Sequence, residues 1–389
     1  MTLAVKHEAL TLGAGPRGWL RSAMTPKSAG FDREWWVNRV REETGKSLSE
    51  QTLEIRSLAS GLGRVQSEEY YEYGLYDDRQ FDDAARATLV GKASWAIMAR
   101  RFNEASARDP GRDRVKAMIY LSRRGVSVPL IYAVYQNEPP ANSLTEVISD
   151  AESLSHFLRH EISYPFVGTP VRLGTNGTSM KVFGYDKSAD CMILEDDRRV
   201  PVINFINAVR RHGETGYIFE EAHKPYPLLM PVCGNHVTSL RMMVFRDGDV
   251  HRIVRPVWLV PCTHRPQNMI GRSGQLVAKL APDTGIASGA MWQRGAVGDP
   301  ITHHPDTGAM LEGTELPNWK RVASMVRQYA ALFPKLAIQR WDVALTERGP
   351  VVTWVSGQAD IQTIQKVWRK GLLVGSLGQA LSETSTGSE

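Results

Sequence analysis

The sequence predicts a globular protein with an α+β fold and two or three domains or subdomains, and one observation supports each part of this prediction. Strand-like and helix-like segments are mixed along the chain without the strict alternation of a doubly wound fold. The chain has 389 residues, which favours two or three domains or subdomains. Hydrophobic residues make up 42% and charged residues 23%, which is typical of a globular protein rather than a disordered chain.

The first part of the chain, residues 1–110, is predicted to be mostly helical. Apolar side chains recur there at near-helical spacing among many charged residues, first at Trp35, Trp36 and Val40 and then at Leu53, Ile55 and Leu58. Residues 83–107 read as one helix that ends at a Pro–Gly pair. The segment 68–81 packs five aromatic residues among acidic ones, and we interpret it as core or docking surface.

After Pro110 the pattern changes to short strands mixed with helices. The expected elements, in chain order, are a helix at 116–124, a strand at 126–135, a helix at 144–161, strands at 164–171, 179–185 and 191–195, a helix at 201–212, strands at 217–219, 238–246 and 250–260, a helix at 319–333, strands at 337–346 and 351–355, and a helix at 360–373. Residues 382–389 are polar and are expected to be disordered.

Composition excludes several classes of function. The net charge is +5, and the four Arg–Arg pairs are scattered rather than gathered on one segment, which argues against a nucleic-acid partner. Three widely spaced cysteines exclude a disulfide scaffold and fit a reducing cytoplasm. The chain has no apolar run near the ~20 residues that span a bilayer, and Lys6 and Glu8 interrupt any secretory signal. We therefore expect a cytoplasmic protein without a membrane span.

A series of motifs follows from the aromatic segment EYYEYGLY to residue 375. They are YPFVGTPVRLGTNGTS (164–179), YIFEEA (217–222), VTSLRMMVF (237–245), QNMIGRSGQLVAKLAPDTG (267–285), HPDTG (304–308), ELPNW (315–319), RWDVALTERGPVV (340–352) and SGQADIQTIQ (356–365). In this order and spacing the chain resembles the sugar-transfer-associated branch of the ATP-grasp superfamily.

The resemblance implies an ATP-grasp fold of two α+β subdomains that hold ATP between them. Residues 111–222 would form the subdomain of the phosphate loop and adenine hinge, and residues 223–375 the second one. The helical region 1–110 would precede them, and a polar tail at 376–389 would follow. Typical members activate a carboxylate as an acyl phosphate that an amine then attacks, so a nucleotide and a carboxylate or amine substrate are the implied partners. This chemistry needs cations over the phosphates and usually Mg²⁺.

Three residues match phosphate-binding positions of the family. Lys116 lies where the first nucleotide-binding lysine is common, although Val115 replaces the usual preceding aspartate. An exposed helical lysine is the alternative. Gly174 and Gly177 would bend a loop so that backbone N–H groups meet phosphate, with an ordinary hairpin turn as the alternative.

Three further residues match positions that contact the rest of the nucleotide or the metal. Glu220 and Glu221 lie at the adenine hinge, where the alternative is solvent exposure at a strand end. Asn268 matches the amide of an Asp–Asn pair, and Gln267 replaces the aspartate.

Arg241 and Asp342 are the candidates for chemistry. Arg241 stands between Leu240 and Met242 on a predicted strand, so it points to the opposite face, where it could meet phosphate. A buried structural ion pair is the alternative. Asp342 matches the family's first metal-binding carboxylate, and the strand pattern predicts that Trp354 shares its face.

Three departures from the family fall on chemical positions. The family's Glu-x-Asn metal ligands are Trp354 and Ser356 here, and Thr169 replaces a phosphate-binding lysine. An indole offers no oxygen ligand, and a neutral hydroxyl is a poor substitute for an amide oxygen. The departures predict weak ATP binding and a deficient Mg²⁺ site.

Two functions follow from this pattern. One is a divergent ATP-grasp protein with weakened or lost Mg-ATP catalysis. The other is an active ATP-dependent ligase of cell-envelope or secondary metabolism, whose metal site is rebuilt from residues such as Asp360, Glu347 or Lys181.

Overall fold

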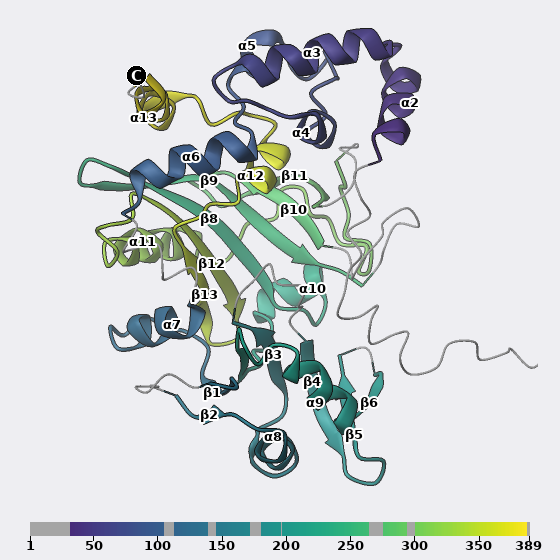
Figure 1. The fold of residues 1–389 in the computed structure, drawn as a ribbon, viewed down its shortest axis with the longest axis vertical. Coiled ribbons are helices and arrows are strands. Elements are labelled where there is room, and N and C mark those ends of the chain that lie inside the picture. The colour runs from purple at the N-terminus through teal and green to yellow at the C-terminus, as the bar shows by residue number, and fades with distance from the viewer. Residues whose placement is uncertain are drawn as a thin grey trace, which may run out of the picture. The chain divides into compact units, whose positions relative to one another are not determined.

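The computed structural model describes residues 32–104, 113–138, 145–171, 180–195, 197–263, 275–293 and 300–386. These residues form one seven-stranded and one six-stranded sheet with helices around them (Figure 1), which confirms the α+β class. Their contacts divide them into two compact units. The first comprises residues 133–219, and the second combines the described residues up to Tyr132 with those from Glu220 onward.

The seven-stranded sheet has the strand order β2-β1-β7-β3-β4-β5-β6. Its elements and the nearby helices are β1 (Ile131–Tyr135), β2 (Val147–Ile148), α8 (Ala151–His156), the π-helical turn η3 (Phe157–Glu161), β3 (Phe166–Pro170), β4 (Met180–Asp186), β5 (Cys191–Leu194), β6 (Arg199–Pro201), α9 (Val202–Arg210) and β7 (Tyr217–Glu221). Four phenylalanine rings make edge-on contacts in its core, those of Phe157, Phe166, Phe205 and Phe219.

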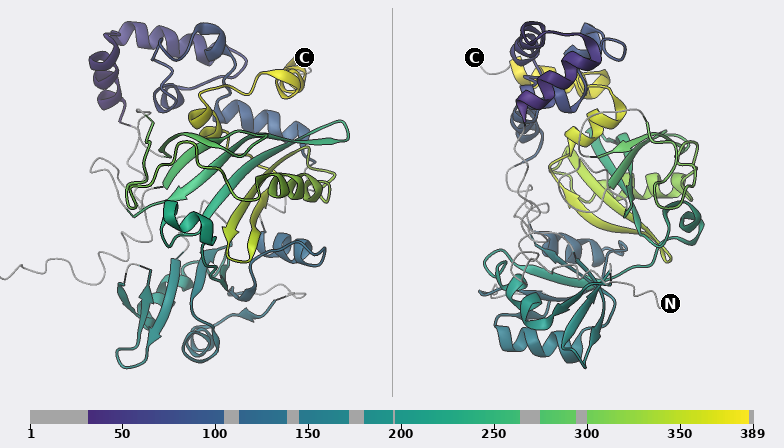
Figure 2. Two further views of the ribbon diagram at one scale, coloured as in Figure 1. Left: turned by 180° about the vertical axis from the view of Figure 1, so that it is seen from behind. Right: turned by 90° about the vertical axis from the view of Figure 1, so that its right-hand side faces the viewer.

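The six-stranded sheet of the second unit is antiparallel throughout, in the order β11-β10-β9-β8-β12-β13. Its elements are η4 (Pro227–Leu229), α10 (Met230–Cys233), β8 (Thr238–Asp247), β9 (Val250–Pro261), β10 (Gln275–Leu280), β11 (Ala287–Trp292), α11 (Trp319–Ala330), β12 (Ile338–Thr346), β13 (Gly349–Ser356), α12 (Ile361–Trp368) and α13 (Gly375–Thr386). Figures 1 and 2 show α11 along one face of this sheet and α6 along the other.

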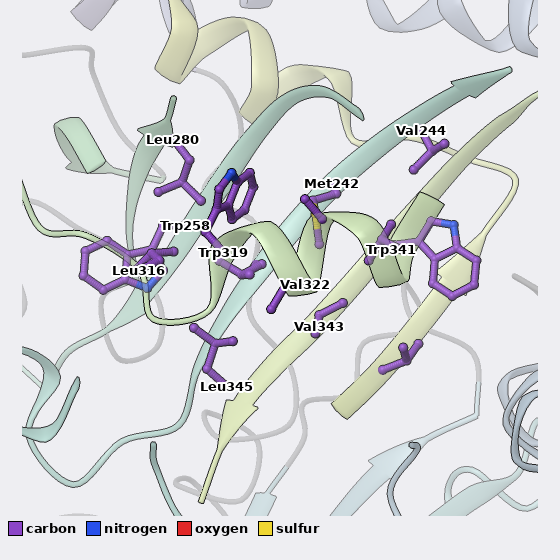
Figure 3. Close-up of a cluster of buried hydrophobic side chains, with 14 of the residues drawn as sticks. Met242, Val244, Trp258, Leu280, Leu316, Trp319, Val322, Trp341, Val343 and Leu345 are labelled. Carbon is purple, nitrogen blue, oxygen red and sulfur yellow. The ribbon is translucent and has the colours of Figure 1, made fainter. Parts of the chain in front are cut away.

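The alternation of side chains along β8 and β12 assigns one residue set to each face. Met242 and Val244 of β8 and Trp341 and Val343 of β12 point toward α11, where they form a buried cluster with Val322 (Figure 3). The residues between them point to the opposite face. That face carries a second apolar cluster with α6, α12 and α13, and it also carries Arg241 and Asp342.

The N-terminal helices belong to the second unit. They are α2 (Arg33–Thr44), α3 (Leu48–Ser60), α4 (Ser67–Glu72), α5 (Asp83–Ala87) and α6 (Lys92–Phe102), and α7 (Arg114–Ser122) follows them. The aromatic segment 68–81 forms a buried core with Trp36 and Val40, as expected for core residues. Tyr71 donates a hydrogen bond to Gln51 within this core, at 2.9 Å.

Three expected elements differ from the structure. The single helix expected at 83–107 is split into α5 and α6, because the backbone of Val90 bonds to the side chain of Gln365 instead of continuing a helix. Within the helix expected at 144–161, residues 147–148 instead form the short strand β2, and the helix begins at Ala151. The expectation of disorder from residue 382 is wrong up to Thr386, since α13 extends that far and buries Leu377 and Leu381. Among the described residues, no helix is both long and apolar enough to cross a bilayer.

Candidate functional site

Arg241 and Asp342 face each other on neighbouring strands. The register pairs Arg241 of β8 with Asp342 of β12, and Asp342 in turn with Trp354 of β13. The three side chains therefore share the face that points away from α11, as the strand pattern predicts for Trp354. Arg241 holds Asp342 with two parallel bonds, since Nε donates to Oδ1 and Nη2 donates to Oδ2, both at 3.0 Å.

Two further charged groups complete this cluster. The third nitrogen of Arg241, Nη1, donates to Oδ2 of Asp360 at 2.6 Å. Arg340 lies two residues before Asp342 on β12 and binds it as well, with Nε 3.1 Å from Oδ1 and Nη2 bonded to Oδ2. Arg241, Arg340, Asp342 and Asp360 thus form a network of two positive and two negative charges, which we call the Arg–Asp network.

The charges in this network stabilise one another. Burial alone would raise the pKa of Asp342, but the guanidinium groups of Arg241 and Arg340 outweigh burial and hold that pKa well below its usual range. Burial alone would lower the pKa of Arg241, and the carboxylates of Asp342 and Asp360 raise it instead. Both side chains are therefore ionised at neutral pH and neutralised by their neighbours.

The Arg–Asp network does not fit a Mg²⁺ ion. Both carboxylate oxygens of Asp342 already accept two guanidinium hydrogen bonds, so neither is free to bind a cation. Trp354 provides no oxygen, and the hydroxyl of Ser356 accepts a bond from the amide of Gln358 at 3.0 Å. Within the described residues, no group of three or more His, Cys, Asp or Glu side chains is arranged to hold a metal ion.

Arg114 is a buried cation beside Trp354 that sequence reasoning missed. It lies in the first turn of α7, and its Nη2 is 2.9 Å from the carboxylate of Glu220 while its Nε donates to the carbonyl of Thr353 at 3.1 Å. Its guanidinium carbon lies 6.0 Å from the centre of the Trp354 ring, which allows a cation–π contact. The signal was present in the sequence, because Arg114 directly follows Asp113 and so has the acidic neighbour that Lys116 lacks.

The other candidate residues have different surroundings. The side chain of Lys116 is 75% exposed and pairs with Asp113 at 3.1 Å. Glu220 is buried against Arg114, whereas Glu221 pairs with Arg348 at 2.6 Å. Gly174, Gly177 and Asn268 lie outside the described residues. The structure therefore brings together Arg241, Asp342 and Trp354, and it links Glu220 to Trp354 through Arg114.

Asp360 and Lys181, two of the candidates for a rebuilt metal site, belong to different compact units. Asp360 joins the Arg–Asp network, as described above. Lys181 of β4 pairs with Glu195 in the first unit, at 3.4 Å. Thr169, where the family has a lysine, is buried in β3.

Comparisons with known proteins show one matching family model and several similar solved structures. The model of the sugar-transfer associated ATP-grasp family matches residues 98–375. A search of curated proteins finds no match. A similar solved structure is the VanG D-Ala:D-Ser ligase from Enterococcus faecalis, with 14% identity, coverage of 73% of this chain and 63% of that one, and a TM-score of 0.39.

Two more solved structures have comparable values. The D-alanine–D-alanine ligase from Bacillus anthracis has 12% identity, coverage of 73% of this chain and 70% of that one, and a TM-score of 0.39. The L-amino acid ligase from Bacillus licheniformis has 12% identity, coverage of 66% and 45%, and a TM-score of 0.34. This chain thus spans less than two thirds of the VanG ligase and less than half of the L-amino acid ligase.

Proposed function

This chain belongs to the sugar-transfer associated ATP-grasp family, and we propose that it is a divergent member that binds an adenine nucleotide with weakened or lost Mg²⁺-dependent catalysis. The observation that carries the proposal is the saturation of Asp342 by Arg241 and Arg340. A carboxylate held by two guanidinium groups has no net negative charge left to attract a divalent cation.

The size of the catalytic loss follows from the chemistry of phosphoryl transfer. Metal ions neutralise the charge that develops on the transferred phosphate, and side-chain cations such as a lysine assist them. Each tenfold loss in rate corresponds to about 1.4 kcal/mol of barrier. The sequence has Trp354 and Ser356 at the family's metal-ligand positions and Thr169 at a lysine position, so several residue types that make such contacts are missing. We therefore expect Mg-ATP turnover to be low by several powers of ten.

Nucleotide binding is proposed for the residues that remain. Glu220 and Glu221 end β7 at the proposed adenine hinge, and Arg114 holds Glu220 in place. Lys116, Gly174, Gly177 and Asn268 stay candidates for the phosphate side. Arg241 is the cation that we propose for an anionic group of the nucleotide or of a carboxylate substrate.

Calorimetric titration with ATP, in the presence and absence of Mg²⁺, tests this proposal. We expect micromolar or weaker binding whose Kd changes less than about threefold when Mg²⁺ is added, and no ADP release with pools of carboxylates and amines. The double variant Trp354→Glu, Ser356→Asn should make binding Mg²⁺-dependent. Trp354→Phe with Ser356→Ala is the matched control, because it changes the same positions without adding oxygen ligands.

An active ligase with a rebuilt site is the alternative. The position of Asp360 favours it, because this second carboxylate reaches the same guanidinium as Asp342. Robust Mg²⁺-dependent ADP release by the wild-type protein that is lost in both Asp342→Ala and Asp360→Ala would replace our proposal with this one.

A further inference from the structure

All three nitrogens of the Arg241 guanidinium bind carboxylate, but from two different elements. Nε and Nη2 bind Asp342 across the β8–β12 pair, where the sheet fixes the geometry. Nη1 binds Asp360, which precedes α12 and is no part of the sheet. The bond to Asp342 is therefore set by strand register, whereas the bond to Asp360 depends on a separate helix.

Asp360 is the member of the Arg–Asp network that solvent reaches most readily. Its side chain is 22% exposed, compared with 10% for Asp342 and 12% for Arg241. Removal of the Asp360 carboxylate would therefore open Nη1 of Arg241 from the solvent side. The network would then hold two cations and one anion, a net charge of +1 in a largely buried position, which favours an anion strongly.

The backbone of α12 is held independently of this contact. Gln365 accepts a bond from the amide of Val90 at 2.9 Å and donates to its carbonyl at 2.8 Å. Lys366 donates to the carbonyl of Gln293 at 3.1 Å. The carboxylate of Asp360 also caps α12, since Oδ1 accepts a bond from the amide of Thr363 at 3.2 Å and Oδ2 accepts one from its hydroxyl at 2.8 Å. When Asp360 leaves Arg241 by rotation of its side chain, these two bonds are lost as well, and the contacts of Gln365 and Lys366 hold the helix in place.

We infer that Asp360 is an internal anion that blocks Nη1 of Arg241, and that an external oxyanion, the phosphate or carboxylate group of a ligand, takes this position when Asp360 withdraws. The contact is thus autoinhibitory for anion binding at Arg241. The inference rests on the proposed role of Arg241 as an anion-binding cation, but it requires neither nucleotide nor Mg²⁺.

The test is calorimetric titration of the full-length protein with inorganic phosphate. We expect Asp360→Asn to bind one phosphate at least tenfold more tightly than the wild type. Asparagine serves as a helix N-cap as well as aspartate does, so the substitution removes the charge and keeps the cap. The gain should disappear in Asp360→Asn, Arg241→Lys, because a lysine lacks the planar set of donors. Wild-type affinity in Asp360→Asn, or a gain that persists without Arg241, would overturn the inference.

If Asp360→Asn does not fold, a second pair of variants tests whether Asp360 blocks anion binding at Arg241. The hydroxyl of Thr363 donates to Oδ2 of Asp360 at 2.8 Å, so Thr363→Val loosens the internal anion without removing it. We expect phosphate to bind about threefold more tightly to this variant, and unchanged affinity would contradict the inference. Thr353→Val is the matched control, because Thr353 donates to the backbone carbonyl of Asp342 and touches no carboxylate of the network.

Acetate titrations distinguish the two sources of oxyanion. Tighter binding of phosphate than of acetate by Asp360→Asn would assign the position to a phosphate group, and the reverse to a substrate carboxylate. Neither titration contains nucleotide, so a failure of wild-type ATP binding rejects the proposed function and leaves this result intact.

Discussion

Arg241 and Lys366 are buried cations of the second unit, and nearby carboxylates offset the cost of burying their charge to different degrees. Arg241 faces two carboxylates. Lys366 donates to the carbonyl of Gln293, and Glu72 is the carboxylate that acts on it electrostatically. Burial lowers the pKa of Lys366 to about 8, and Glu72 offsets only part of this shift. The charged form of Lys366 is therefore destabilised in the folded protein, unlike that of Arg241.

We predict that Lys366→Met changes the pH dependence of stability. The folded pKa of Lys366 is about 8 and lies below the unfolded value near 10.4, so the unfolded state binds the proton more tightly between these values. In the wild type, the free-energy cost of burying the charged form of Lys366 is therefore fully present below pH 8. This cost disappears as the pH rises from the folded pKa to the unfolded pKa. Relative to the wild type, the variant should therefore be more stable at pH 7 than at pH 9.5 by about 1–3 kcal/mol in the free energy of unfolding.

Urea unfolding at pH 7 and pH 9.5 measures this difference. Loss of the bond to Gln293 shifts the free energy of unfolding equally at both values, so the comparison between them isolates the charge. Lys335→Met is the control, since Lys335 is exposed and pairs with the exposed Glu104. An identical wild-type-to-variant difference at both pH values would contradict the prediction.

Among the elements, α13 shows how a polar sequence still contributes to a core. Its residues are mostly small or polar, but Leu377 and Leu381 stand four positions apart and therefore lie on one side of the helix. Both are buried in the apolar cluster that also contains Trp95 and Met98 of α6. This helix covers part of the sheet face that carries the Arg–Asp network.

We predict that Leu381→Ala lowers the free energy of unfolding by about 2–4 kcal/mol, because it leaves a cavity in this cluster. Gln379→Ala, an exposed position on the same helix, should change it by less than about 0.5 kcal/mol. Chemical denaturation followed by tryptophan fluorescence measures both. If Leu381→Ala lowers the free energy of unfolding by no more than Gln379→Ala does, then α13 does not pack as described.

Across the second unit, segments far apart in sequence are joined by buried side chains that hydrogen-bond to backbone groups. Gln365 binds both the amide and the carbonyl of Val90. Asn103 accepts a bond from the amide of Ile338 at 3.0 Å and donates to the carbonyls of Ile338 and Gly357, both at 2.8 Å. These hydrogen bonds connect the N-terminal helices to α12 through Gln365 and to β12 of the six-stranded sheet through Ile338.

We predict that these helices and the sheet unfold as one cooperative unit. The amides of Val90 and Ile338 both bond to buried side chains, so each should exchange with solvent only through global opening. Native-state hydrogen exchange in increasing denaturant should give free energies within about 1 kcal/mol of each other at these two amides. Much faster exchange at Val90, with Ile338 still protected, would show that the N-terminal helices open separately.

Local sequence patterns were enough to predict the α+β class, the strands that carry Arg241, Asp342 and Trp354, and the shared sheet face of Asp342 and Trp354. These features follow from local patterns, because alternation along a strand fixes which residues share a face. The ordered motifs likewise pointed to the ATP-grasp family that the family model matches. Register then placed Asp342 opposite Trp354, in agreement with the strand pattern.

The compensation of the buried charges, in contrast, depends on contacts between distant segments that local patterns do not predict. Asp360 is not a partner of Arg241 in any sequence pattern, and Arg114 meets Trp354 only because α7 packs beside β13. Likewise, α13 is ordered because two leucines find an apolar cluster built by distant segments. Electrostatic and packing energies depend on the distance between groups, and for residues a hundred positions apart the fold alone sets that distance.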